Sequence, residues 1–209
     1  MHLAFLTLQR TPDRAESILR ELHTAGFTKM HCHLGVDAQA KAGIDALPWW
    51  RPARATWPRQ WGRIEPALAC AESHLRIYST ALRKSEPALI FEDDTKLLAP
   101  AAQFHAAIAE APEGWDIIHF HERTDYDPIR ERESGGHTPQ LRALASIGYG
   151  TVAYAVSPKG IYKIMRAAYP LDRPIDVTIQ EIGGLVAYRT AQPLATRDGA
   201  FPSEIRAAS

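Results

Sequence analysis

The first forty residues alternate between two kinds of hydrophobic pattern. Leu3 to Leu8 form a short, nearly continuous apolar run, which is typical of a strand buried on both faces of a parallel sheet. Thr11 and Pro12 then provide a helix start, and apolar residues recur at helical spacing until Gly26. Met30 to Val36 form a second candidate strand. The order strand, helix, strand predicts that the chain opens with a βαβ unit of an α/β fold.

The most regular helical pattern lies between Pro66 and Leu82. Its apolar positions follow the 3,4,3,4 spacing of one helix face, and a second row beside the first includes His74. Pro66 suits the first helical turn, where its missing N–H leaves no bond unmade. Because the two rows together form a wide apolar face, we expect this helix to be mostly buried.

The rest of the chain continues the alternation of strands and helices, with two irregular interruptions. A segment from Gly43 to Arg63, rich in Trp, Arg and Pro, predicts a long functional loop that stacks on sugar rings or bases, or pins itself on the core. The charged segment from Arg123 to Leu141 predicts a surface excursion or a mobile lid. The remaining predicted elements are strands at Pro87–Phe91, Trp115–Phe120, Gly148–Val156 and Leu185–Tyr188, helices at Ala101–Ala111 and from Ser157 onward, and a turn at Asp172–Asp176.

Composition changes this picture little. The 209 residues suit one domain spanning 1–209, and 45% hydrophobic with 23% charged residues is the balance of a globular protein. The 24 basic and 24 acidic residues cancel, so we expect no stable nucleic acid binding. Two cysteines far apart predict neither a disulfide framework nor a zinc site, and no leader-like start or apolar run of about 20 residues is present. We therefore expect a cytoplasmic protein whose membrane contact, if any, is peripheral and at the inner face of the membrane.

The strongest chemical signal is a run of three acids, Glu92-Asp93-Asp94, directly after an apolar strand. Neighbouring carboxylates repel one another, and a divalent cation such as Mg²⁺ or Mn²⁺ removes that cost. Strand alternation predicts that Glu92 and Asp94 share a face and that Asp93 points away. Ligands of open α/β sheets also gather beyond the carboxyl ends of strands. The competing interpretation is a solvated acidic turn.

A set of motifs in this order resembles glycosyltransferase family 25, which includes lipooligosaccharide and collagen galactosyltransferases. The resemblance implies a single GT-A-like (Rossmann-related) α/β domain with a mostly parallel central sheet flanked by helices. It also implies a UDP-sugar donor and Mn²⁺ or Mg²⁺ at the acidic motif. The segment Glu65 to Ala69 lacks the glycines that family members often carry there, and the two irregular segments match no family pattern. The motifs that carry the resemblance are Arg10 and Arg14 after the first strand, Val36-Asp37-Ala38, Cys70-x-x-Ser73-His74, Leu89-Ile90-Phe91-Glu92-Asp93-Asp94, Trp115-Asp116-Ile117, Gly150-Thr151 with Ala153-Tyr154, Ser157-x-Lys159-Gly160 and Pro174-x-Asp176.

The resemblance assigns roles around the donor. It places Asp94 and Glu92 on the metal, with Asp94 the better candidate for a direct ligand, and Asp93 beside them in the donor site. Guanidinium groups match phosphate geometry, so Arg10 and Arg14 are expected to contact the nucleotide, although Arg14 suits a solvated helix turn equally well. The remaining donor-binding candidates are Leu8 at the end of the first strand, Asp37 as a partner of ribose hydroxyls or a turn aspartate, and Ser73 and His74 as pocket-lining or core groups.

Asp176 is the candidate general base, which would take the proton from the acceptor hydroxyl. The competing interpretation is that Asp176 caps the following helical turn, and Asp172, Glu181 and Asp198 compete for the catalytic role. Two histidine pairs, His119 with His121 and His31 with His33, have the alternation of a metal pair, but neither has a third ligand at a suitable spacing. We therefore interpret both pairs as structural.

The sequence thus predicts a metal-dependent, inverting hexosyltransferase. Galactose or glucose would move from a UDP-sugar to a hydroxyl of a glycan acceptor, of the kind found in lipopolysaccharide. One alternative keeps the fold and changes the acceptor to a hydroxylated DNA base or a protein side chain. Another is a non-catalytic relative that binds sugar nucleotide or glycan without turnover.

Overall fold

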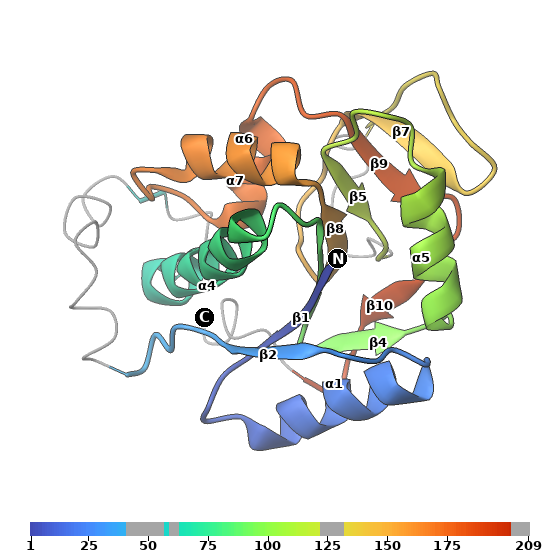
Figure 1. Cartoon of the computed structure of the whole chain (residues 1–209). Coiled ribbons are helices and arrows are strands. Elements are labelled where there is room, and N and C mark those ends of the chain that lie inside the picture. The colour runs from blue at the N-terminus through green and yellow to red at the C-terminus, as the bar shows by residue number, and fades with distance from the viewer. Residues whose placement is uncertain (41–56, 59–62, 122–131, 202–209) are drawn as a thin grey trace.

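A mixed sheet forms the centre of the computed structural model, which describes residues 1–40, 57–58, 63–121 and 132–201 (Figure 1). Eight strands of these residues pair in the order β2-β1-β3-β8-β5-β9-β7-β6. A separate two-stranded sheet pairs β4 with β10. The strands are β1 His2–Thr7, β2 His31–Leu34, β3 Ala88–Glu92, β4 Thr95–Leu97, β5 Ile117–His119, β6 Arg132–Glu133, β7 Leu141–Ser146, β8 Ala153–Val156, β9 Ala187–Thr190 and β10 Ala195–Arg197.

Most strands of the central sheet run in one direction. β1 is parallel to β2 and to β3, and β5 is parallel to β9. β8 lies antiparallel between β3 and β5, and β7 lies antiparallel between β9 and β6. Among the described strands of this sheet, only β7 and β8 run in the opposite direction. The sheet is therefore mostly parallel, as predicted.

Helices cover both faces of the sheet and confirm the α/β class. One apolar core packs α4, α6 and α7 on one face, and a second packs α1 and α5 on the other (Figure 1). Among the helices in the described ranges, none combines the length and the apolar composition that a bilayer crossing requires. The helices are α1 Pro12–Thr24, α4 Ile64–Arg83, α5 Ala101–Glu110, α6 Pro158–Ala168 and α7 Ile175–Glu181.

Helices that carry a clear apolar stripe lie where the sequence predicts them. α4 buries most of both apolar rows, including His74, which has no exposed surface. Several short elements differ from the predictions. Leu141–Ser146 is a strand inside the sheet where an irregular excursion was expected to end, and the predicted turn at 172–176 leads into α7 from Ile175. The Trp-rich loop, apart from Trp57, Pro58 and Arg63, and residues 123–131 of the predicted lid lie outside the described residues.

Helix α6 is locked to the sheet through Asp116, which precedes β5 and is fully buried. Its carboxylate accepts hydrogen bonds from Lys163 Nζ at 2.5 Å and from the Val186 amide at 2.8 Å. Its carbonyl oxygen accepts from the amide of Ser157, the N-cap of α6, at 2.9 Å. Gly160 packs directly against this same carbonyl, because a Cβ there would lie 2.9 Å from the carbonyl carbon and closer still to the oxygen. The motifs around Asp116 and Ser157 therefore form one joint between α6 and the sheet.

Three histidines pack together at the β1–β2 edge of the sheet. His2 is 2% exposed, stacks on His31 with ring centroids 4.8 Å apart, and shares a 2.9 Å hydrogen bond with His33. Burial, then the charges of His33, His31 and Lys84, lower the pKa of His2 to about 4, and only Glu86 opposes them. The described ligand atoms of these rings do not converge as a metal site would require. The three rings form a packed, hydrogen-bonded cluster at this edge.

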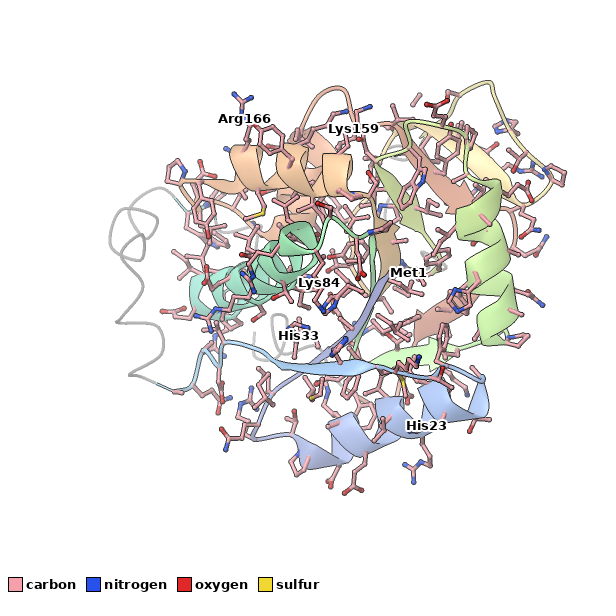
Figure 2. The ribbon with its side chains drawn as sticks, in the orientation of Figure 1. Met1, His23, His33, Lys84, Lys159 and Arg166 are labelled. Atoms are coloured by element: carbon pink, nitrogen blue, oxygen red, sulfur yellow. The ribbon has the colours of Figure 1, made fainter. Side chains whose placement is uncertain are left out.

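Because of this histidine cluster, we expect the folded protein to lose stability in mild acid. An unfolded histidine binds a proton near pH 6.5, whereas His2 in the folded chain binds one only near pH 4. The free energy of unfolding should therefore fall as the pH drops from 6.5 towards 4, by about 1 kcal/mol once solvent screening is allowed for. Urea unfolding at pH 7 and pH 5 measures the change, and His2→Gln should reduce it. The exposed His23, labelled in Figure 2, supplies the control, since His23→Gln should leave the loss in place.

Candidate active site at the ends of β1 and β3

The candidate site lies where the carboxyl ends of β1 and β3 meet. The two strands are parallel with Leu6 opposite Glu92, so the residues that follow each strand emerge at the same edge. Thr7, the last residue of β1, donates a 2.9 Å hydrogen bond from Oγ1 to Oδ2 of Asp93. This parallel register is therefore the reason that the acidic motif and the residues after β1 share one site.

The three acids all line one cavity. Glu92 ends β3, whereas Asp93 and Asp94 form the turn into β4. The predicted alternation, with Asp93 pointing away, is wrong because β3 ends at Glu92, two residues before the Asp94 that the argument needed on the same strand. All three side chains consequently face the same space, and the exposed turn of the competing interpretation is absent, since Asp93 and Asp94 are 8% and 6% exposed.

Two arginines partly neutralise the turn. Arg14 Nη2 lies 2.5 Å from Oδ1 of Asp93 and 3.7 Å from Oδ2 of Asp94. Arg197 Nε lies 3.0 Å from the same Asp94 oxygen. Even so, burial raises the pKa of Asp93 above its ordinary value against the opposing effects of Arg14 and Thr7. Removal from water therefore disfavours the charged form of Asp93 more than its two partners favour it.

Asp94 carries the clearest sign of a cation site. Burial, followed by the charge of Glu92, raises its pKa to about 6 despite Arg197 and Arg14. Its Oδ1 is buried and has no hydrogen-bond partner among the described residues. Buried carboxylate oxygens are normally hydrogen-bonded or metal-bound, and oxygen ligands from one or two carboxylates suit Mg²⁺ or Mn²⁺. The residues present fit a divalent cation, with Asp94 as the better ligand.

Glu92 is held from behind by a buried hydrogen-bond network. Its Oε1 accepts from the Thr151 hydroxyl and lies 3.2 Å from Nε2 of His74. His74 Nδ1 is 2.8 Å from the Tyr154 hydroxyl, which is 2.6 Å from that of Tyr78. Burial acts to raise the pKa of Glu92, but the hydrogen bond and charge of His74, with Thr151, outweigh it and lower the pKa. The network therefore keeps Glu92 ionised and fixes one of its oxygens.

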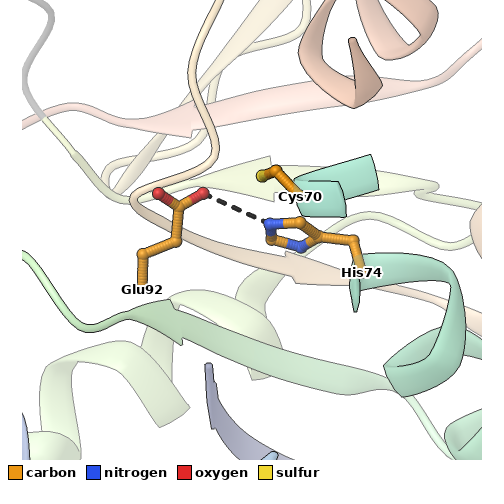
Figure 3. Close-up of side chains that lie close together, drawn as sticks. All are labelled: Cys70, His74 and Glu92. Atoms are coloured by element: carbon orange, nitrogen blue, oxygen red, sulfur yellow. Dashed lines mark hydrogen bonds and ion pairs between the residues drawn. The ribbon is translucent and has the colours of Figure 1, made fainter. Parts of the chain in front are cut away.

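Cys70 completes a group that resembles a metal site by distance alone. Ligand atoms of Cys70, His74 and Glu92 lie within 4.8 Å of one another, and Figure 3 shows the three side chains together. However, both ring nitrogens of His74 already have partners, and burial followed by the nearby carboxylates raises the pKa of the Cys70 thiol well above its ordinary value. With both nitrogens engaged, His74 presents no free ligand atom to a cation. This group is best described as a hydrogen-bonded histidine–carboxylate pair beside an apolar sulfur.

The predicted donor-binding residues mostly converge. Leu8, Arg10, Arg14 and Ser73 line the same cavity as the acids, and His74 lies directly behind Glu92. Asp37 lines a neighbouring hollow and pairs with Arg10 at 3.0 Å.

Ser73 is also a structural group. Its Oγ donates to the Ala69 carbonyl at 2.6 Å and accepts from the Val36 amide at 2.8 Å. It thereby ties α4 to the loop after β2, which forms the cavity wall, and its role in donor binding stays a prediction.

Asp176 lies in the first turn of α7, near the cavity but not among its lining residues. Its carboxylate accepts from the amides of Val177 at 2.9 Å and Gly150 at 3.2 Å. The second bond holds the segment that presents Thr151 to Glu92. Of its competitors, Asp172 and Glu181 both pair with Arg173. The N-cap of α7 is Pro174 and no side chain of the described residues caps this helix, so the capping interpretation of Asp176 is wrong, and the role of general base stays a prediction.

The sequence prediction missed three polar residues of this site. Thr7 lies inside an apolar run, Thr151 was noticed only as part of a family motif, and Arg197 had no signal at all. Thr7 was predictable in principle, because parallel pairing brings the last residue of β1 next to the residue after β3. Arg197 was not, because its approach depends on the pairing of β10 with β4.

The family comparison agrees with the motifs. Residues 65–179 match the family model described as glycosyltransferase family 25 (LPS biosynthesis protein). No match is found among curated proteins. Among solved structures, A197 from STIV is 12% identical with a TM-score of 0.47, covering 90% of this chain and 81% of that one. Mannose-1-phosphate geranyltransferase from Thermus thermophilus is also 12% identical, with a TM-score of 0.48 and coverages of 90% and 72%. Mouse xyloside xylosyltransferase 1 is 12% identical, with a TM-score of 0.38 and coverages of 85% and 66%.

Proposed function

The chain belongs to glycosyltransferase family 25, and from this premise we propose that it moves galactose or glucose from a UDP-sugar to a hydroxyl of a lipopolysaccharide-type glycan, with inversion. The description of the family as one of LPS biosynthesis supports the acceptor class. By its family the chain is a glycosyltransferase.

One observation carries the metal-dependent part of the proposal. Asp94 Oδ1 is buried, without a partner among the described residues, in a cavity that Arg10 and Arg14 also line. An anionic ligand bound with a cation accounts for both features. The cation would bind the unbonded Oδ1 of Asp94, and the anion would pair with the two arginines. A UDP-sugar with Mn²⁺ or Mg²⁺ has this charge pattern.

The residues of the site then have distinct tasks. Asp94 and Glu92 hold the cation, which supplies Lewis-acid stabilisation of the departing diphosphate. Arg10 and Arg14 bind the phosphates, and the His74 network keeps Glu92 ionised. The acceptor oxygen attacks the anomeric carbon as the bond to UDP breaks, and its proton passes to a carboxylate, for which Asp176 is our candidate.

Thermal unfolding with Mn²⁺ and UDP tests the donor site directly. Ligands that bind only the folded chain stabilise it by about 2.7 kcal/mol at a hundredfold excess over Kd. We expect UDP with Mn²⁺ to raise the Tm by several degrees, and UMP with Mn²⁺ to raise it less because UMP lacks the β-phosphate. If neither nucleotide raises the Tm, the proposed donor site is contradicted.

A panel of UDP-sugars with candidate glycans, with the products read by mass spectrometry, then identifies the sugar and the acceptor together.

A further inference from the structure

Arg197 reaches the acidic turn from the far end of the chain. β10 pairs with β4 so that Arg197 lies opposite Thr95, and the amide of Asp198 donates to the Asp94 carbonyl at 2.6 Å. This pairing places the Arg197 guanidinium 3.0 Å from Asp94 Oδ2, on the same carboxylate as the oxygen that lacks a hydrogen-bond partner among the described residues. Arg197 lies outside the residues that match the family.

The two arginines at the turn are held very differently. Arg14 is 11% exposed, pairs with Asp93 at 2.5 Å, and lies under the ring of Phe201 with its guanidinium carbon 5.4 Å from the ring centre. Arg197 is 31% exposed and pairs with Asp94, the carboxylate best suited to the cation. Arg14 is therefore fixed in place, whereas Arg197 has solvent on one side and can change partner.

We propose that Arg197 is an exchangeable donor-binding residue, which neutralises Asp94 in the free protein and moves to the diphosphate when cation and donor arrive. The inference rests on the proposed function. A divalent cation at Asp94 repels a guanidinium on the same carboxylate, and a diphosphate offers that guanidinium bidentate bonds. Arg197 consequently disfavours the metal alone and favours the metal with its nucleotide, which couples the two binding events.

This coupling predicts that removing the charge changes two affinities in opposite directions. In Arg197→Gln, Mn²⁺ alone should bind about tenfold more tightly, because it no longer competes with a cation at Asp94. UDP in saturating Mn²⁺ should bind about tenfold more weakly, because a charge-assisted contact to phosphate is lost. Calorimetric titration of Mn²⁺ alone, and of UDP in saturating Mn²⁺, measures both constants without any turnover.

Two further variants control the measurement. Arg197→Lys keeps the charge and should lie between wild type and Arg197→Gln in both titrations. Arg166→Gln removes an arginine on the outer side of α6, as Figure 2 shows, and should bind both ligands like wild type. If Arg197→Gln weakens Mn²⁺ binding, or leaves either affinity unchanged in a folded protein, the exchange role is overturned. Failure of wild type to bind UDP with Mn²⁺ would instead remove the proposed function.

Discussion

Asp94→Asn is expected to lower the rate of sugar transfer by about a thousandfold, with little change in fold. An amide has the same shape as the carboxylate but carries no charge, and the buried Oδ1 that is available to a cation loses its ligand strength. Negative charge that develops on the leaving diphosphate then lacks its main counter-charge. Transfer and slow hydrolysis of the donor, both followed by mass spectrometry with Mn²⁺ present, should fall together.

An exposed aspartate provides the matched control. Asp13 lies in the first turn of α1 and is exposed, so Asp13→Asn removes the same charge away from the cavity and should retain full activity. A circular-dichroism melting curve establishes that Asp94→Asn is folded. Turnover close to that of wild type in a folded Asp94→Asn protein would contradict the metal assignment, and with it the interpretation of the turn as a donor motif.

Gly160→Ala should cost about 3 kcal/mol of unfolding free energy or more, although alanine normally favours helices over glycine. The added Cβ would collide with the carbonyl group of Asp116, which is main chain and cannot rotate away. This carbonyl accepts a hydrogen bond from the amide of Ser157, the N-cap of α6. Moving the carbonyl therefore also breaks this hydrogen bond. Helix α6 must therefore shift away from the sheet, and the bond from Lys163 to the buried Asp116 carboxylate weakens with it.

Denaturant unfolding of Gly160→Ala beside Gly183→Ala measures this effect. A Cβ at Gly183 would meet no atom within 4 Å. Its substitution should change stability by less than about 1 kcal/mol. Equal stability of the two variants would show that α6 does not approach the sheet as closely as the contact between Gly160 and Asp116 implies.

Helices α1, α4, α5 and α6 were predictable because each carries an apolar stripe or a clear helix start, whereas α7, with seven residues, was too short to be predicted. The apolar stripe of α4 alone was sufficient to predict that His74 is buried. Short strands were harder to predict. β10 and β4 have three residues each, too few for a period, and β7 was obscured by the charged segment before it. Such strands are defined by their partners rather than by their own residues.

The candidate site divides in the same way. The acids were recognisable from a charged triplet after an apolar strand, and the residues after β1 came from the resemblance to the family. The direction of Asp93 was predicted wrongly, because alternation was extended past the end of β3. The hydrogen bonds of His74 with Glu92 and with Tyr154 connect residues 18 and 80 positions apart, and no local pattern encodes such contacts.

By itself the sequence determined the α/β class, the place of the acidic motif at a strand end, and the family. Each of these depends on periodicity or on motifs within a few residues, where the chain's own geometry dictates the outcome. Tertiary structure alone decided which cations face Asp94, how Glu92 is held and where α6 meets the sheet. Those features depend on close packing between segments far apart in the chain, and close packing is specified only when the whole core is assembled.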